Sequence, residues 1–217
     1  TLAHYGVCFD EGAGIGEDGK ICDKGAYGPY KQSKRVEIYH VFAKKLVSEG
    51  KAYPVFTTKE ELEALNAIDK KAEVKAKDWH EDQGEQREEM LRNRNFTIDE
   101  VKAHLEAGDP FVLRMLSDGD PDKKIKFTDL IKGERELPEN DRDEVLLKSD
   151  GVPSYHFAHA IDDHLMHTTH VIRGDEWISS VPKHIQLFKI LQFKRTKCKN
   201  WDFRKKPWGC FNKFFWC

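Results

Sequence analysis

Apolar residues recur at helical intervals in the first half of the chain. In one stretch they recur at helical spacing, at Val36, Tyr39, Ala43, Leu46 and Val47. This spacing predicts a helix with Ser33 as its N-cap and Gly50 as its C-terminal stop. A capping box of Thr58 and Glu61 predicts that a second helix follows. Residues 69–95 are highly charged and weakly amphipathic, which predicts a solvated helical arm.

Two further helices are predicted from the residues at their ends. Thr97 and Glu100 form a capping box ahead of "IDEVKAHLEAG", and Gly108 closes that helix. A serine at position 179 or 180 precedes "VPKHIQLFKIL". Pro182 then falls in the first turn of a helix, where proline is tolerated because its missing N–H has no partner there.

Short apolar or alternating runs predict the strands. These runs are "KAYPVFTT", "PFVLRML", "KIKFTDLIKGERELP", "DEVLLK" and "THVIRG". After a turn at Asp150 and Gly151, the aromatic residues of "VPSYHFAHAI" predict one more strand. The stretch up to about residue 32 is rich in glycine and predicts loops. Its "GAGIG" lacks the flanking strand and helix of a dinucleotide-binding loop. The whole pattern predicts an α/β core that carries an α+β insertion.

Five of the ten histidines lie between Ser154 and Trp177. They are His156, His159, His164, His167 and His170, with Asp162 and Asp163 among them. On a helix, such spacing could gather rings on one face to bind a metal. In a strand, residues three apart point to opposite faces, so the strand prediction favours packed or hydrogen-bonded histidines instead. Arg173 ends the "HVIR" run before Gly174, which makes it a candidate receptor for a carboxylate or phosphate, with a surface salt bridge as the alternative.

Composition narrows the classes of function. The chain has 36 basic and 38 acidic residues and a formal net charge of −2, so nucleic-acid binding would require a local basic face. No apolar run approaches the roughly 18–20 residues of a membrane span, and the N-terminus lacks a signal-peptide layout. Five widely spaced cysteines without a CxxC pair indicate a reducing compartment. The segment after residue 194 is rich in basic and aromatic residues, a composition that could bind nucleic acid. We prefer the alternative that this segment is not native to the fold.

Three blocks of the sequence together resemble one family. The blocks are "GPYKQSKRVEIYHVFAKKLVSEGKAY", "GDPFVLRM" and "VLLKSDGVPSYHFAHAIDDHLMHTTHVIRGDEWISSVPKHIQLFKIL". They resemble glutamyl-tRNA synthetase of the bacterial and organellar type, a class I aminoacyl-tRNA synthetase, over about residues 5–194. The resemblance implies an α/β fold, part of a class I Rossmann-type catalytic domain, with an α+β insertion that contacts the tRNA acceptor end. It assigns 1–52 and 144–194 to the catalytic domain, 53–143 to the insertion and 195–217 to a divergent tail.

The same resemblance implies a reaction and a set of site residues. The family activates L-glutamate with ATP and Mg²⁺ to glutamyl-adenylate and transfers the glutamate to tRNA(Glu), without a side-chain nucleophile. The residues that correspond to glutamate-binding positions are Tyr155, His156, Phe157, Ala158, His159 and Arg173. Glu176 and Trp177 fall at positions near the ATP. Relatives often carry Asn at the position of His159. Asp162, Asp163 and His164 are expected to support the local geometry. In some members of the family, the insertion holds a zinc site made of cysteines just after the position of "KAY". The matching stretch here, "PVFTT", has no cysteine, so no zinc is expected.

Two motifs of the family do not occur in this sequence, the HIGH motif and the KMSKS-like loop. We therefore expect a fragment that is inactive in adenylate formation on its own. We also expect a monomer without a membrane partner, in the cytoplasm or alternatively in an organelle. Two other functions stay open at this point. One is a catalytically dead tRNA-binding paralogue, and the other is a metal-dependent hydrolase built on the histidines and aspartates.

Overall fold

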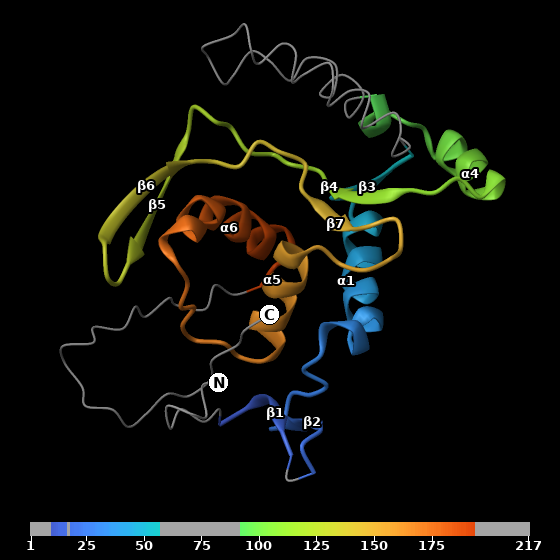
Figure 1. The fold of residues 1–217 in the computed structure, drawn as a ribbon. Coiled ribbons are helices and arrows are strands. Elements are labelled where there is room, and N and C mark those ends of the chain that lie inside the picture. Colours follow the sequence, from blue (N-terminus) through green and yellow to red (C-terminus); the bar gives the residue numbers. More distant parts are fainter. Residues whose placement is uncertain (1–9, 17, 57–91, 194–217) are drawn as a thin grey trace, which may run out of the picture.

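The computed structural model describes residues 10–16, 18–56 and 92–193 (Figure 1). The helix predicted after Thr58, the charged arm up to residue 91 and the tail 195–217 lie outside the described residues. The described elements follow one another in this order: β1 (Gly12–Ile15), β2 (Ile21–Lys24), η2 (Gln32–Lys34), α1 (Val36–Ser48), β3 (Ala52–Val55), α4 (Ile98–Ala107), β4 (Val112–Met115), β5 (Lys124–Asp129), β6 (Gly133–Pro138), β7 (Val145–Leu147), α5 (Tyr155–Leu165), η3 (Asp175–Ser180) and α6 (Val181–Ile190).

A small antiparallel sheet and three helices form the core. The sheet has the order β3-β4-β7, and its register pairs Ala52 with Met115. Helix α1 contacts β3 and α5, while α5 also contacts β7 and α6. The side chains that these elements bury most completely are Tyr39, Leu46, Met115, Leu146, Phe157, Ile161 and Leu187. Burying one such side chain stabilises a fold by about 1.5–3 kcal/mol, so this cluster fixes how the helices sit on the sheet.

Two antiparallel hairpins complete the described structure. Strands β1 and β2 pair within the stretch that was predicted to be loops, and "GAGIG" contributes β1. The loop prediction is wrong there because backbone hydrogen bonds between the two strands form this hairpin. Its Ile15 and Ile21 are exposed, so the sequence lacks the alternation of buried and exposed residues that predicts a strand. Strands β5 and β6 form the second hairpin, as the sequence predicts. None of the described helices is long and apolar enough to cross a membrane.

The predicted helix ends are confirmed at α4. At α1 the stop at Gly50 is confirmed, with a φ of 66°, and the N-cap is corrected. Thr97 and Glu100 form the expected capping box, and Gly108 follows α4 with a φ of 77°. Helix α1 is preceded by Arg35 rather than capped by Ser33, which lies in η2. Arg35 is only 2% exposed, and its buried ion pair fixes where the helix begins.

The largest correction concerns residues 154–174. The stretch predicted to be a strand after Pro153 is helix α5. The amide of Ser154 still bonds to Leu146 of the sheet at 2.8 Å, but the Ser154 hydroxyl then accepts from the Phe157 amide and caps the helix. Apolar residues four positions apart, such as Phe157 and Ile161, face the core. The "HVIR" run forms no strand either.

Candidate functional site

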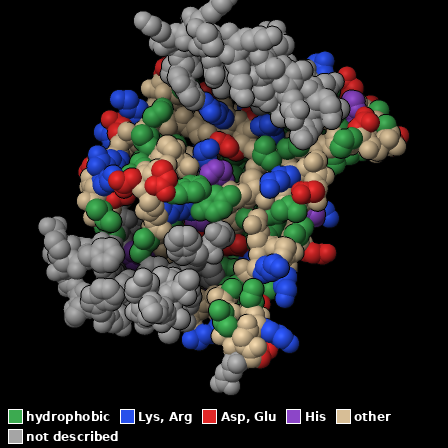
Figure 2. Space-filling view, viewed as in Figure 1, with side chains coloured by type: hydrophobic (Ala, Val, Ile, Leu, Met, Phe, Trp, Pro, Cys, Tyr) green, Lys and Arg blue, Asp and Glu red, His purple; other side chains and the backbone are tan. Residues whose placement is uncertain are grey.

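Helix α5 carries three polar side chains along one side. His159 follows His156 by three residues and Asp163 follows His159 by four, and these are the separations at which helical side chains become neighbours. Because the segment is a helix, the histidine rings converge instead of pointing to opposite faces. Figure 2 shows histidine side chains beside hydrophobic ones near the centre of the molecular face seen in Figure 1.

Three side chains from later in the chain meet this side of α5. Arg173 comes from the coil after α5, Trp177 from η3 and His184 from the first turns of α6. The packing of α6 against both α5 and η3 brings them together. The Nδ1 atom of His156 lies 2.8 Å from the Nε2 atom of His184, which joins the two helices directly.

The guanidinium of Arg173 lies at the centre of this cluster. Its Nη1 atom is 3.3 Å from Nδ1 of His184, and its Nη2 atom is hydrogen-bonded to Nε2 of His159. Its central carbon is 5.5 Å from the ring centroid of Tyr155 and 5.6 Å from that of Trp177, within the range of cation–π attraction. Within the described ranges 10–16, 18–56 and 92–193, no carboxylate forms an ion pair with Arg173.

Burial keeps the histidines of the cluster neutral. Desolvation, followed by the positive charge of Arg173, lowers the pKa of His159 from 6.5 to about 3. Desolvation also lowers the pKa of His184, with further contributions from His159 and Arg173. The pKa of His156 is lowered for the same leading reason, burial. The cluster therefore surrounds one positive charge with neutral rings.

The two aspartates of α5 have structural partners. Asp162 is 9% exposed and accepts hydrogen bonds from Arg35 and Tyr39 of the first part of the chain. Asp163 lies 3.1 Å from Nε2 of His159, and burial raises its pKa from 3.8 to about 7. Among the described residues, no group of three or more histidines, cysteines or acids is arranged to hold a metal ion. The rings converge on a guanidinium.

The structure brings some of the site residues predicted from the sequence together and leaves others apart. The guanidinium of Arg173 lies among four other predicted residues, which are Tyr155, His156, His159 and Trp177. The side chains of Phe157 and Ala158 do not join them, because both are fully buried in the core. Glu176 is exposed, and its carboxylate lies over Gly174, where a side chain on residue 174 would clash with it.

Sequence reasoning missed His184, although it is as central to the cluster as the predicted residues. Spacing within α6 does not reveal it, because its partners come from α5 and from the coil before η3.

Comparison with known proteins identifies the family. Residues 12–205 match the family described as tRNA synthetases class I (E and Q), catalytic domain. The chain belongs to this family of class I tRNA synthetases. It is 46% identical over 197 residues to the glutamate–tRNA ligase of Clostridium perfringens strain 13, which covers 91% of this chain and 34% of that protein. It is 48% identical over 180 residues to the enzyme of Sorangium cellulosum, which covers 81% of this chain and 29% of that protein.

Solved structures agree with this assignment. A glutamate tRNA ligase from Elizabethkingia meningosepticum, crystallised in complex with its amino acid, superposes with a TM-score of 0.65 and 36% identity. The match covers 78% of this chain and 33% of that one. The fold is therefore that of a class I synthetase catalytic domain, with mixed helices and strands. The chain spans about a third of the length of the curated relatives that it matches.

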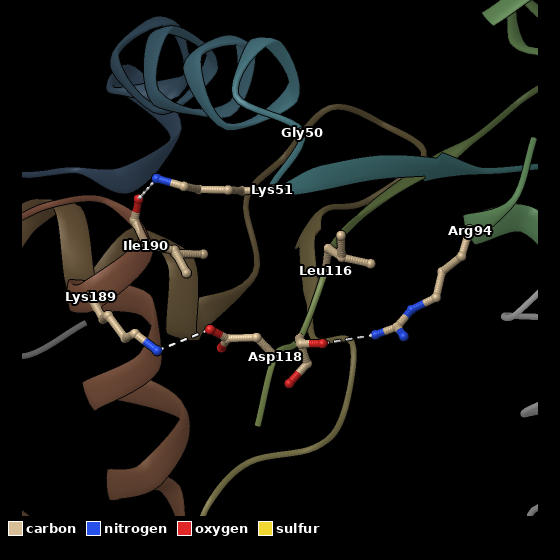
Figure 3. Close-up of a pocket in the computed structure, with 8 residues that line it drawn as sticks. Gly50, Lys51, Arg94, Leu116, Asp118, Lys189 and Ile190 are labelled. Carbon is tan, nitrogen blue, oxygen red and sulfur yellow. Dashed lines mark hydrogen bonds and ion pairs between the residues drawn. The ribbon is translucent and has the colours of Figure 1, made fainter. Parts of the chain in front are cut away.

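A cavity of about 410 Å³ lies at the opposite, C-terminal end of α6 in this synthetase domain (Figure 3). Its lining includes three cationic side chains, and each forms an ion pair with an acidic side chain. Lys51 bonds to Glu49 at 2.6 Å, and Lys189 bonds to Asp118 at 2.9 Å. Arg94 is paired with Asp143, outside the lining. The charges of this cavity are neutralised internally, unlike that of Arg173, so the Arg173 cluster is the stronger candidate for binding an anionic ligand.

Proposed function

We propose that this chain is the glutamate-binding part of a glutamate–tRNA ligase. The observation that carries the proposal is the half-buried guanidinium of Arg173, which is oriented by neutral imidazoles and has no carboxylate partner among the described residues. Such a fork binds a carboxylate through two parallel charge-assisted hydrogen bonds. The rings of Tyr155 and Trp177 flank it and would exclude water from the bound ligand.

Arg173 is assigned to the side-chain carboxylate of L-glutamate. In the proposed reaction, an oxygen of the α-carboxylate attacks the α-phosphorus of ATP, which forms glutamyl-adenylate and releases pyrophosphate. A guanidinium that held both oxygens of this nucleophile would oppose the attack. Holding the side-chain carboxylate avoids this conflict and also rejects glutamine, because a neutral amide cannot compensate the charge of Arg173.

The remaining substrates follow from the same assignment. Glu176 and Trp177 lie in η3 directly after Arg173, and we place ATP, as its Mg²⁺ complex, on this side of the site. The terminal ribose hydroxyl of tRNA(Glu) would attack the carbonyl of the adenylate and release AMP. This chemistry requires positioning and charge stabilisation rather than a nucleophilic side chain. We further propose a monomer that acts in the cytoplasm.

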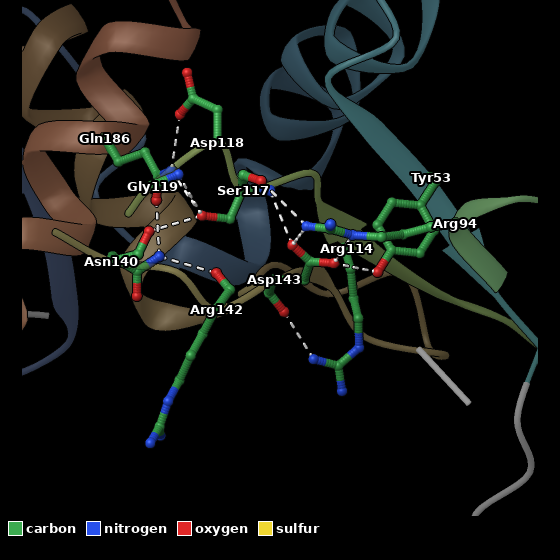
Figure 4. Close-up of polar contacts among 10 residues, drawn as sticks. All are labelled: Tyr53, Arg94, Arg114, Ser117, Asp118, Gly119, Asn140, Arg142, Asp143 and Gln186. Atoms are coloured by element: carbon green, nitrogen blue, oxygen red, sulfur yellow. Dashed lines mark hydrogen bonds and ion pairs between the residues drawn. The ribbon is translucent and has the colours of Figure 1, made fainter. Parts of the chain in front are cut away.

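Residues 53–143 are proposed to be the insertion that contacts the tRNA acceptor end, within a Rossmann-type catalytic domain. The two ends of this segment meet, since the Tyr53 hydroxyl donates to Asp143 at 2.5 Å (Figure 4). Asp143 also accepts from Arg94 at 2.6 Å and from the Ser117 amide at 2.8 Å. Ends that are fixed to each other in this way support an inserted unit whose chain leaves and re-enters the catalytic domain at one place.

Ligand binding to the purified chain tests this assignment. Titration with L-glutamate should shift the side-chain NMR signals of Trp177, and L-glutamine should bind at least tenfold more weakly. Arg173→Gln should weaken glutamate binding by roughly 10- to 100-fold, because it removes a charge-assisted pair. Arg135→Gln, an exposed arginine on β6, is the matched control. Equal binding of glutamate by Arg173→Gln and the parent chain would refute the proposal.

A further inference from the structure

His184 holds a position that neither its helix nor the predicted site explains. It is 8% exposed, and its ring stands between Arg173 and His156, with the His159 ring centroid 4.8 Å away. Both of its nitrogens are engaged, Nδ1 with Arg173 at 3.3 Å and Nε2 with His156 at 2.8 Å. A ring that was buried only to fill space would not need two polar partners, so its chemistry requires an account.

The donors and acceptors in this cluster determine where each proton lies. A guanidinium can only donate, so Nδ1 of His184 must be unprotonated and accept from Arg173. The proton of a neutral His184 ring is then on Nε2, which donates to Nδ1 of His156. By the same reasoning His159 accepts from Arg173 at Nε2 and carries its proton on Nδ1. One protonation pattern thus fits all three printed contacts among Arg173 and the rings. Asp163, 3.1 Å from Nε2 of His159, fits it as a protonated carboxyl, in line with its raised pKa.

This pattern gives Arg173 a fixed orientation without neutralising its charge. A carboxylate in the place of His184 would also orient the guanidinium, but it would form an ion pair and compete with an incoming carboxylate. A neutral imidazole accepts one hydrogen bond and leaves the positive charge available. The other charged or titratable groups that act on His184 are His156, His159 and Lys183, and Lys183 is itself paired with Glu144 at 2.6 Å.

We propose that His184 is a positioning residue. Its neutral ring, protonated on Nε2, accepts a hydrogen bond from Arg173 and holds the guanidinium in the orientation that receives the substrate carboxylate. This inference rests on the proposed function, since it assigns His184 a role only through Arg173. It also predicts that His184 contributes to the discrimination between glutamate and glutamine, although it is not expected to touch either ligand.

The protonation pattern can be measured directly in the whole chain by NMR with ¹⁵N-labelled imidazole rings. His184 and His156 should carry their protons on Nε2, and His159 should carry its proton on Nδ1. His159 and His184 should stay neutral from about pH 8 down to about pH 5.5, a range in which an unperturbed histidine, with a pKa near 6.5, becomes charged. A His184 ring protonated on Nδ1, or one that gains a second proton in this range, would overturn the proposal.

Substitutions separate positioning from a purely structural role. His184→Leu should weaken L-glutamate binding roughly tenfold, because a neutral acceptor of Arg173 is lost. His184→Asn places an amide oxygen near the position of Nδ1 and should retain affinity within about threefold. Phe188→Leu removes core packing on the same helix, so it should lower stability without changing glutamate affinity.

The outcomes distinguish this inference from the function on which it rests. If Arg173→Gln loses affinity while His184→Leu binds glutamate like the parent chain, the positioning role is wrong and the proposed function stands. If both bind like the parent chain, both are wrong. If His184→Asn is as defective as His184→Leu, the acceptor at Nδ1 is not what matters, and the inference fails. An equal loss of affinity in Phe188→Leu would reduce the role of His184 to packing and would also overturn it.

Discussion

Replacing Asp162 with asparagine tests the polar contact that joins the first and last parts of the domain. The Oδ1 atom of Asp162 accepts from Nε of Arg35 at 2.9 Å and pairs with Nη2 at 2.9 Å, while Oδ2 accepts from Tyr39 at 2.7 Å. Arg35 also donates to the carbonyls of Tyr27 and Pro29, at 3.1 and 3.0 Å. The substitution removes the negative charge and leaves the backbone partners of Arg35 in place.

The expected loss follows from the burial of both charges. Arg35 is 2% exposed and Asp162 is 9% exposed, so water cannot replace the missing carboxylate. Removing one partner of a buried ion pair typically costs about 3–5 kcal/mol, because the other charge remains buried and uncompensated. Asparagine keeps one acceptor oxygen, which places the expected loss near the lower value, about 3 kcal/mol. This is a large part of the roughly 5–15 kcal/mol that stabilises a typical domain.

Urea unfolding of the whole chain measures this loss as a shift of the midpoint at constant slope. Asp99→Asn is the matched control, because Asp99 is 95% exposed and its ion pair with Lys102 should contribute little. The double variant Arg35→Met with Asp162→Leu should lose less stability than the two single changes predict together, since it leaves no buried charge. A loss for Asp162→Asn that is no larger than that for Asp99→Asn would refute the reasoning.

Three further predictions concern single side chains. Burial raises the pKa of Asp163 from 3.8 to about 7, so the stability that its carboxyl contributes below about pH 4 is lost as the pH rises through 7. Asp163→Asn has no such group, so its free energy of unfolding should rise relative to that of the parent chain by up to about 4 kcal/mol between about pH 4 and pH 8. Urea unfolding at a series of pH values measures this gain. Asp143→Asn should cost about 3 kcal/mol in the same assay, since Arg94 loses its anionic partner. Thr97→Ala should cost about 1 kcal/mol by loss of the cap of α4, with faster amide exchange confined to that helix.

Local signals in the sequence predict the helices and strands whose own residues determine them. The capping box of Thr97 and Glu100 and the stop at Gly108 mark α4 at both ends, and the structure has the helix between them. The alternation of charged and apolar residues in "KIKF" likewise predicts β5, and exposed and half-buried residues alternate along Lys124–Asp129 in the structure. In these elements, local propensity and tertiary packing favour the same conformation, so a reading of the sequence alone suffices.

Long-range contacts determine what the sequence did not predict. Ser33 has the side chain of an N-cap, but α1 begins after Arg35 because the ion pair with Asp162, which lies 127 residues away, fixes the backbone there. The candidate site depends on long-range packing in the same way. Arg173 could be singled out from its residue type and its neighbour Gly174. His184 could not, because its role arises only where α6 packs against α5.

The conformation of residues 155–165 decides what the histidine spacing means. The aromatic residues and Pro153 favour a strand, and in a strand His156 and His159 would point to opposite faces. The apolar residues Phe157 and Ile161, four positions apart, favour a helix, and burial of both against the sheet and α6 prevails. Once the segment is helical, intervals of three and four residues gather His156, His159 and Asp163 on one side, which is the arrangement expected of a metal site. The cluster instead receives a guanidinium, because neutral imidazoles in a buried site can accept hydrogen bonds from Arg173 without cancelling the charge that a carboxylate ligand requires.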